Sequence, residues 1–431
     1  MAHAREEYIE PSEDCQIVYN PLPAVAIGGP PHSGKSVLTY SLTQALRLRS
    51  VDHYVIRAYP PDGEGDWFQA GDRETVRHYR VKREPGGDWV APLVRDVAAR
   101  HLPLIVDMGG LPTAEQETVL AACTHGVVLA PDRASQAAWR ARFERYGLVL
   151  LADLRSELRG QDRLTAAYPI LRGTLAGLER GRLAHGPAFV ALFERLTALF
   201  RSAAQDLRRR HLAAAPVELA VDLTALARPL DIDPRRWPPR ELPRVLDYLP
   251  AGQTLGLYGR GPNWLYAAVA RHTAPAPFYL FDVRHGWVRA PDAVGGVPTP
   301  RVGGPTPPRP SGVEWLQHTA QPLGSDSCAG HPVHATLTHV AGRALLTVEL
   351  TDAYLDLAAL PPLAFPVVAE DALILSGKLP LWLWAALARA YCQPWLAVMQ
   401  PQLGGAVVIA AEEGAPGVGA VVPVPAAGGE A

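Results

Sequence analysis

One stretch of this chain recurs in diverged form 118 positions later, and this repetition constrains the fold more than any other feature. Residues 259–286 align with residues 377–404 without a gap, and nine of the 28 positions are identical. A repeat of this size predicts two small domains of one fold, which can pair about an approximate two-fold axis. The identical pairs include proline and tryptophan, which an alanine-rich composition does not explain: Gly259 and Gly377, Pro262 and Pro380, Trp264 and Trp382, Leu265 and Leu383, Ala267 and Ala385, Ala268 and Ala386, Ala270 and Ala388, Arg271 and Arg389, Gly286 and Gly404.

The first 152 residues have a different pattern, in which short apolar segments alternate with helical periodicity. Strands and helices that alternate at this spacing predict a parallel sheet covered on both faces. The expected strands are 25–27, 54–56, 104–107, 127–130 and 148–152, and the expected helices are 36–49, 89–100, 114–122 and 134–146. Residues 155–212 have a helical period throughout.

A glycine-containing loop lies between the first expected strand and the first expected helix. Its sequence, Gly29-Pro-Pro-His-Ser-Gly-Lys-Ser36, matches the eight-position phosphate-binding pattern of P-loop proteins. We expect Gly29, Ser33 and Gly34 to direct backbone N–H groups at phosphate oxygens. Lys35 would reach the β- and γ-phosphates, and the Ser36 hydroxyl would bind Mg²⁺. The expected ligand is ATP or another nucleotide with Mg²⁺, and a glycine turn without ligand is the alternative.

Asp107 ends the third expected strand and is the natural second ligand of that Mg²⁺ ion. A P-loop ATPase of the ring-forming type would carry glutamate at the next position to polarise water. This chain instead has Met108, followed by two glycines. Nucleotide binding or a kinase-like transfer is therefore as well supported as hydrolysis. A strand-end cap without metal is the alternative for Asp107.

Composition narrows the classes of function. Apolar residues make up 48% of the chain, charged residues 19%, and the formal net charge is −2. Such a chain is not expected to hold long nucleic acid, and the arginines at residues 208–210 are better explained as a helix end. The four cysteines have no paired or metal-type spacing, and no apolar run reaches the roughly 20 residues of a membrane helix. We expect a cytoplasmic protein.

In both repeats a strand leads into a short turn and then into a helix. The first turn is Tyr258-Gly-Arg-Gly-Pro262, and the second is Ser376-Gly-Lys-Leu-Pro380. Glycine permits close approach of the backbone, proline suits the first helical turn, and a basic side chain stands between them. Each turn is therefore a candidate anion cradle.

The repeats differ where chemistry is expected. Asp282 and Arg284 of the first repeat correspond to Gln400 and Gln402 of the second. A carboxylate can orient a hydroxyl or hold a metal ion, and an arginine can stabilise charge on a phosphate. An exposed ion pair at a strand end is the alternative for this pair.

The motif Gly-Arg-Gly-Pro-x-Trp-Leu, followed by a helix, a strand and Asp-x-Arg-x-Gly, resembles the CRISPR-associated ring nuclease family known as Csx three. The resemblance spans residues 215–290 and, in the second repeat, 335–425. The second repeat fits through Ser376-Gly377, Pro380, Trp382-Leu383 and Leu403-Gly404. Members of that family also occur joined to P-loop domains.

The resemblance implies cleavage of cyclic oligoadenylate, chiefly cyclic tetra-adenylate, a second messenger of type III CRISPR defence. Family members pair as dimers, so the duplication would supply the dimer within one chain; we also expect a homo-oligomer. Asp282, Arg284 and His285 would be catalytic, with Asp282 also a ligand of Mn²⁺, and the second repeat would bind without cutting. The ring would be held by Tyr258, Gly259, Arg260, Gly261 and Pro262 in the first repeat and by Ser376, Gly377 and Lys378 in the second.

These observations predict an α/β protein. Residues 1–212 would form a parallel-sheet P-loop NTPase or kinase-like domain with a helical extension. Residues 213–290 and 335–412 would form two repeated α/β domains, CARF-like or ferredoxin-like, that make a pseudo-dimer. Residues 291–334 would be a linker rich in proline and glycine, and 413–431 a frayed tail.

Two other functions stay open on the sequence alone. The repeats could be a sensor of cyclic oligoadenylate that controls a P-loop ATPase or kinase effector. Alternatively, the chain could be a nucleotide kinase whose repeats only dimerise.

Overall fold

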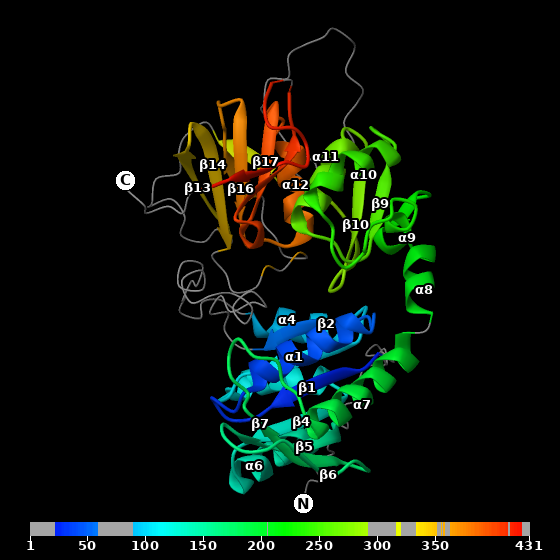
Figure 1. Cartoon of the computed structure of the whole chain (residues 1–431), viewed down its shortest axis with the longest axis vertical. Coiled ribbons are helices and arrows are strands. Elements are labelled where there is room, and N and C mark those ends of the chain that lie inside the picture. Colours follow the sequence, from blue (N-terminus) through cyan, green and yellow to red (C-terminus); the bar gives the residue numbers. More distant parts are fainter. Residues whose placement is uncertain are drawn as a thin grey trace, which may run out of the picture.

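The computed structural model describes residues 22–58, 89–204, 206–291, 316–319, 333–350, 355, 357, 363–412 and 414–424. They form one lobe on a seven-stranded sheet and a second lobe on two smaller sheets (Figure 1). Separately, β12 (Leu316–Thr319) pairs in parallel with β15 (Leu363–Pro366). Within these ranges, no helix is long and apolar enough to cross a membrane.

The seven-stranded sheet has the order β2-β3-β1-β4-β5-β7-β6, and its strands pair in parallel except for β6 with β7. Every residue of β1 and β3 is buried, as expected for central strands covered on both faces. The predicted parallel sheet is therefore present. Its strands are β1 (Ala24–Gly28), β2 (Tyr54–Ala58), β3 (Leu104–Met108), β4 (His125–Ala130), β5 (Val149–Glu157), β6 (Arg163–Ala166) and β7 (Leu171–Ala176).

Helices cover the two faces of this sheet and give it two apolar cores. On one face α1 (Lys35–Leu48) and α7 (Pro187–Ala204) pack on Val25 and Ile27 of β1. On the other face α4 (Val90–Ala98) and α6 (Arg133–Arg145) pack on Ala24 and Ala26. Alternate residues of one strand thus serve opposite cores, which fixes the register of β1.

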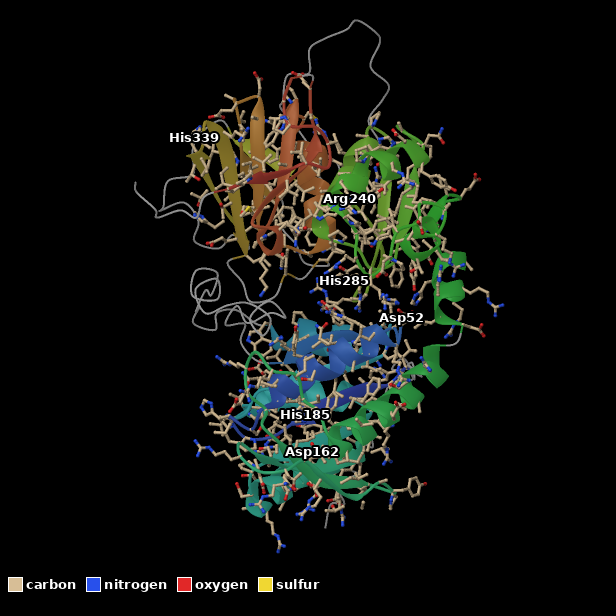
Figure 2. All side chains as sticks on the ribbon, in the orientation of Figure 1. Asp52, Asp162, His185, Arg240, His285 and His339 are labelled. Carbon is tan, nitrogen blue, oxygen red and sulfur yellow. The ribbon has the colours of Figure 1, made fainter. Side chains whose placement is uncertain are left out.

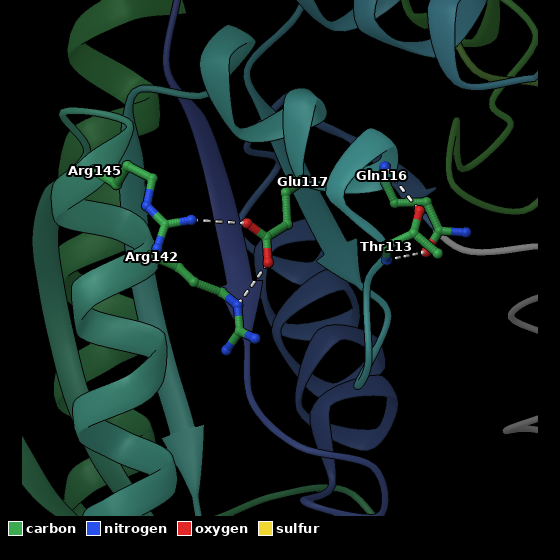
Figure 3. A network of polar contacts seen from close by, with 5 residues as sticks. All are labelled: Thr113, Gln116, Glu117, Arg142 and Arg145. Carbon is green, nitrogen blue, oxygen red and sulfur yellow. Dashed lines mark hydrogen bonds and ion pairs between the residues drawn. The ribbon is translucent and has the colours of Figure 1, made fainter.

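A polar network fastens the short helix α5 (Ala114–Glu117) to α6 (Figure 3). Thr113 and Gln116 form a reciprocal capping box at the start of α5. Glu117, at its end, accepts from Arg142 Nε at 2.8 Å and pairs with Arg145 at 3.4 Å. The helix predicted over residues 114–122 is α5 followed by a 3₁₀ helix, η1 (Thr118–Ala122).

The helix predicted throughout residues 155–212 is wrong for the first part of that range. β5 continues to Glu157, and β6 and β7 form an antiparallel pair before α7 begins. Gly173 permits the close approach of β6, because a Cβ there would lie 2.3 Å from the Arg163 carbonyl oxygen. The helical part is α7 and α8 (Leu207–Ala213).

The second lobe contains two α/β units (Figure 1). The first unit has the sheet order β11-β10-β9-β8, and the second has the order β13-β14-β16-β17-β18-β19. The first unit comprises β8 (Ala220–Asp222), α9 (Leu223–Ala227), η2 (Pro239–Glu241), α10 (Leu242–Tyr248), β9 (Leu255–Tyr258), α11 (Asn263–His272), β10 (Phe278–Asp282) and β11 (Gly286–Arg289). The second comprises β13 (Val333–Val340), β14 (Arg343–Leu350), β16 (Ala372–Gly377), α12 (Leu381–Ala390), β17 (Trp395–Gln400), η4 (Pro401–Leu403), β18 (Gly405–Ala410) and β19 (Val421–Pro423).

Four strands of each unit have the same order and directions. In the first unit β8, β9 and β10 are parallel neighbours, and β11 returns antiparallel to β10. In the second unit β14, β16 and β17 are parallel neighbours, and β18 returns antiparallel to β17. Helices α11 and α12 connect the second and third strands of these sets, and their bounds differ by the same 118 residues as the sequence repeat.

The two units share one apolar core, to which α11 and α12 contribute the largest side chains. Trp264, Trp382 and Trp384 are at most 2% exposed, and both helices belong to a single cluster of buried residues. The helices lie between the two sheets (Figure 1). An apolar helix face on each unit is thereby buried against the other.

Two expected boundaries need correction. The linker predicted at 291–334 contains β12, and the second unit begins with β13 at Val333; residues 292–315 and 320–332 lie outside the described ranges. The tail predicted from 413 contains β19, because Val421, Val422 and Pro423 pair with β18. Residues 1–21 and 425–431 are also outside the described ranges.

Candidate functional sites

The loop after β1 forms a tight turn at the carboxyl edge of the large sheet. Gly34 precedes α1 in the left-handed region, with φ of 87°, which favours glycine. Lys35 Nζ donates to the carbonyl oxygens of Gly29 and Pro30, at 2.8 and 2.9 Å. The lysine therefore folds back over the loop, where its ammonium group can meet a phosphate.

Gly29 and Gly110 are required by close packing around this loop. A Cβ on Gly29 would lie 1.9 Å from the Leu129 carbonyl oxygen, and one on Gly110 would lie 2.4 Å from the Pro31 nitrogen. The segment that follows β3 therefore packs directly on the loop at residues 29–36. Met108, where an ATPase of the ring-forming type would carry glutamate, is fully buried in the core.

Ser36 and Asp107 come together beneath the loop, as the sequence predicts. Ser36 Oγ donates to Asp107 Oδ2 at 3.2 Å. Burial raises the pKa of Asp107 to about 6, against the opposing influence of Arg57, Lys35 and Ser36. Burial also lowers the pKa of Lys35, and Asp107 partly offsets that.

The oxygens around this pair fit a magnesium ion that arrives with a nucleotide. Asp107 Oδ1 and Ser33 Oγ are buried and have no hydrogen-bond partner among the described residues. An unpartnered buried carboxylate oxygen is costly unless a ligand satisfies it. Mg²⁺ commonly takes one or two protein oxygens and completes its shell with water and substrate phosphates.

Residues of another segment also pack near this loop, and no sequence motif predicted their position there. Residues 177–186, between β7 and α7, approach α1: a Cβ on Gly34 would lie 2.8 Å from Leu178, and Ala184 N donates to Ser41 Oγ at 2.9 Å. The segment carries Arg180, Arg182 and His185. Three glycines with positive φ, at 177, 181 and 186, shape it, and no motif announces that shape.

The two repeated turns have matching backbones. Gly259 and Gly377 have φ of 114° and 151°, values that L side chains rarely adopt. Pro262 and Pro380 precede α11 and α12 with closely similar dihedral angles, φ/ψ of −72°/157° and −64°/153°. In the first turn the Tyr266 hydroxyl donates to Gly259 O at 2.5 Å.

Both turns lie at the same end of the helix pair. Arg271, near the end of α11, donates to Tyr391 O and Gln393 O, just past the end of α12. Arg389 reciprocally donates to Ala270 O at 3.0 Å. At the other end, Asn263 Nδ2 lies 3.5 Å from Met399 O on β17. The helices therefore run side by side, with both N-termini and both turns on one side.

Individual turn residues differ in their surroundings. Tyr258 is 8% exposed, and its hydroxyl is hydrogen-bonded to His211 Nδ1 at 3.0 Å, so this ring is part of the packing. Arg260 donates to the carbonyl oxygen of His53, in the N-terminal lobe, at 3.0 Å. Ser376 is half-buried, whereas Gly377 and Lys378 are exposed.

The three residues expected to be catalytic occupy the hairpin between β10 and β11. Asp282 Oδ1 accepts from the Arg284 backbone N–H at 2.8 Å and lies 3.7 Å from Arg284 Nε. His285 Nδ1 is 4.0 Å from Asp96 Oδ1, on α4 of the N-terminal lobe. His285 and Asp52 lie at the junction of the two lobes in Figure 2.

This hairpin offers a manganese ion a single carboxylate, that of Asp282. Asp282 Oδ1 is already engaged by Arg284, and nowhere in the described ranges do three His, Cys, Asp or Glu side chains converge as metal ligands. The hairpin is also remote from the Ser36–Asp107 pair. It faces α4 and His101, before β3, whereas Asp107 is at the carboxyl end of β3.

Comparison with protein families gives a match to part of the chain. The profile of the CRISPR-associated protein family Cas_csx3 matches residues 348–423, from the end of β14 through β19. No curated protein matches the chain. The match associates the chain with CRISPR systems and covers the turn at 376–380 and α12.

Proposed function

We propose that this chain is a CRISPR-associated enzyme that cleaves cyclic oligoadenylate, chiefly cyclic tetra-adenylate. A nucleotide-binding N-terminal domain regulates or assembles it. The two α/β units would be copies of one ring-binding domain, joined as a pseudo-dimer. The second unit, which carries Gln400 and Gln402 in place of Asp282 and Arg284, would bind without cutting.

The observation that carries this proposal is that the two glycine turns lie at the same end of the α11–α12 helix pair. Residues 258–262 and 376–380 begin two parallel, paired helices, so their backbone N–H groups and helix N-termini lie at one end of the pair. Two such ends can hold the phosphates of a symmetric ring. The Cas_csx3 match covers the second of these turns.

The hairpin between β10 and β11 supplies groups suited to phosphodiester cleavage, with no step assigned to a metal ion. Asp282 would orient a ribose 2′-hydroxyl and take its proton as the oxygen attacks the adjacent phosphorus. Arg284 would stabilise the developing negative charge, and His285 would give a proton to the leaving 5′-oxygen. The bond between phosphorus and that 5′-oxygen breaks, so the ring opens to a linear product.

The N-terminal domain would bind ATP or another nucleotide. Lys35 would neutralise phosphate charge, and Ser36 and Asp107 would hold the Mg²⁺ that accompanies it. Because Met108 is buried and apolar, nothing at that position can activate water. Binding or phosphoryl transfer is thus better supported than hydrolysis.

A direct test uses purified full-length protein and cyclic tetra-adenylate, with products identified by mass spectrometry. We expect linear fragments from the wild type in Mn²⁺, in Mg²⁺ or in EDTA, since no step is assigned to a metal at the hairpin. Asp282→Asn should reduce the rate by about 100-fold or more. The matched change Gln400→Glu in the second unit should leave it within about threefold. An intact ring that still binds tightly would reject cleavage.

One observation favours a second candidate, in which the units sense the ring and the N-terminal domain is the effector. The hairpin with Asp282 and Arg284 is nearly buried against the N-terminal lobe, as a signalling contact would be. In that case ring binding should change ATP turnover or phosphoryl transfer, and Lys35→Ala should abolish this output while ring binding survives.

A further inference from the structure

The hairpin at residues 282–286, hereafter the first hairpin, is covered by the N-terminal lobe. The side chains of Asp282, Arg284 and His285 are only 10%, 16% and 15% exposed. Asp96, which faces His285 from α4, is 7% exposed. A phosphodiester about to be cleaved could not reach these groups while the lobes stay in this arrangement.

Residues of the N-terminal lobe lie against the first hairpin. His285 Nδ1 lies 4.0 Å from Asp96 Oδ1. Gly286 rests on the imidazole of His101, so closely that a Cβ there would be 3.2 Å from the ring. Asp282 and Asp96 are near enough for their charges to act on the Arg284 guanidinium, and Tyr54 also lies near it. Residues from α4, β2 and the segment before β3 therefore surround the hairpin.

The same lobe also engages the first ring-binding turn. Arg260 donates to the carbonyl oxygen of His53 at 3.0 Å, and Asp52 is near enough to interact with its charge. A ring phosphate at this turn would compete for the guanidinium that the N-terminal lobe now holds. Both features of the first unit that the proposed function uses are thus occupied at once.

We infer that docking of the N-terminal lobe and productive ring binding by the first unit are mutually exclusive. This inference rests on the proposed function. The lobe acts as a built-in inhibitor that covers the first hairpin through Asp96, His101 and Tyr54 and holds Arg260 through His53. The ring binds when the lobes separate, so its apparent affinity is reduced by the fraction of molecules that are docked.

Within the part of the chain that the structure describes, no contact comparable to that of Asp96 with His285 covers the hairpin of the second unit. Pro401, Gln402, Leu403 and Gly404 are exposed, and Gln400 is bonded to Gln402. Arg284 and His285 of the first unit correspond to Gln402 and Leu403 here. Inhibition therefore falls on the unit that keeps the cutting residues, which is where it would control the reaction.

The test uses the full chain with Asp96→Arg, which places a cation against Arg284 and His285. Glu115→Arg, an exposed acid-to-arginine change on α5, is the matched control. His101→Ala removes a second docking contact without placing a charge in the core. Circular dichroism checks folding, and hydrogen exchange of peptides spanning 282–289 reports docking without any ring present.

We expect Asp96→Arg and His101→Ala to speed exchange in residues 282–289 and to lower the Kd for cyclic tetra-adenylate about tenfold. Glu115→Arg should change neither. In the wild type, adding the ring should speed exchange in α4.

Two results would overturn the inference. If the wild type binds the ring and an undocked variant binds it no more tightly, inhibition is rejected while the proposed function stands. If no variant binds the ring even though exchange shows an exposed hairpin, the proposed function and the inference fall together.

Discussion

The two hairpins at residues 282–286 and 400–404 end in glycines of the same conformation and differ in their surroundings. Gly286 and Gly404 end them in the left-handed region, with φ of 73° and 67°. The first hairpin carries an ion pair under the N-terminal lobe, and the second carries exposed glutamines. The repeated fold places both hairpins at equivalent positions, whereas, among the described residues, the N-terminal lobe covers the side chains of the first hairpin alone. The contrast makes the second hairpin a reference state for the first.

The largest expected effect follows from copying one residue of the second hairpin into the first. Arg284→Gln reproduces Gln402 and removes the group that would stabilise phosphate charge, so ring cleavage should fall by about 100- to 1,000-fold. Gln402→Ala should change the rate less than about twofold. Single-turnover cleavage of cyclic tetra-adenylate measures both. Equal losses in the two variants would erase the functional difference between the hairpins.

The two repeated turns, at residues 258–262 and 376–380, differ in how much space surrounds their glycines. A Cβ on Gly377 would lie 2.3 Å from the Val348 carbonyl oxygen, whereas a Cβ on Gly259 would meet nothing closer than 3.4 Å. Gly377→Ala should therefore destabilise by about 3 kcal/mol or more, and Gly259→Ala by about 1–2 kcal/mol. Thermal unfolding of both variants measures the gap. A larger loss for Gly259→Ala would contradict the packing of the second turn.

The glycines that end the hairpins provide a smaller and more specific contrast. Gly404→Ala meets nothing within 4 Å, so it should cost only the left-handed strain, about 1 kcal/mol. Gly286→Ala has the same strain and also presses on His101 at 3.2 Å. It should add faster hydrogen exchange in α4, which Gly404→Ala should not. Unchanged exchange in both variants would mean that the first hairpin does not press on the N-terminal lobe.

Local signals predicted much of this molecule. The loop after β1, with Gly34, Lys35 and Ser36, is contiguous in sequence. Asp107 is near the end of β3, and the parallel pairing of β1 with β3 brings it next to Ser36. The constant offset of 118 residues between the repeats likewise predicted that α11 and α12 begin at equivalent positions. In each case the residues that must meet are close in sequence or lie at the ends of adjacent strands.

The features that sequence reasoning missed depend on contacts between distant segments. Asp96 and His285 meet across the two lobes, and so do His53 and Arg260. The antiparallel pairing of β6 with β7 was hidden because residues 155–176 also have a helical period. The segment at 177–186 reaches Gly34 only through tertiary packing. No local sequence pattern predicts contacts of this kind, because each depends on how whole helices and strands pack together.

The smallest predicted effect concerns pH and again separates the two units. His211, on α8, stacks on Phe281 with 4.3 Å between ring centroids. Its Nδ1 is hydrogen-bonded to the Tyr258 hydroxyl. The second unit has Ser376 at the position of that tyrosine. Burial, reinforced by His101 and Arg210, lowers the pKa of His211 to about 4. The neutral imidazole is favoured in the native state, whereas the unfolded chain takes up a proton near pH 6.5. The stability it contributes is therefore complete above about pH 6.5 and is lost as the pH falls toward 4.

His211→Gln should reduce the drop in Tm between pH 7.5 and pH 5 by about 3 °C. Some pH dependence should remain, because burial also lowers the pKa of His101 despite the nearby Asp282. His334→Gln, at a histidine on β13 of the second unit, is the matched control and should leave the drop unchanged. If His211→Gln and the wild type lose the same stability on acidification, the packing of α8 against the first unit is not what makes this molecule sensitive to acid.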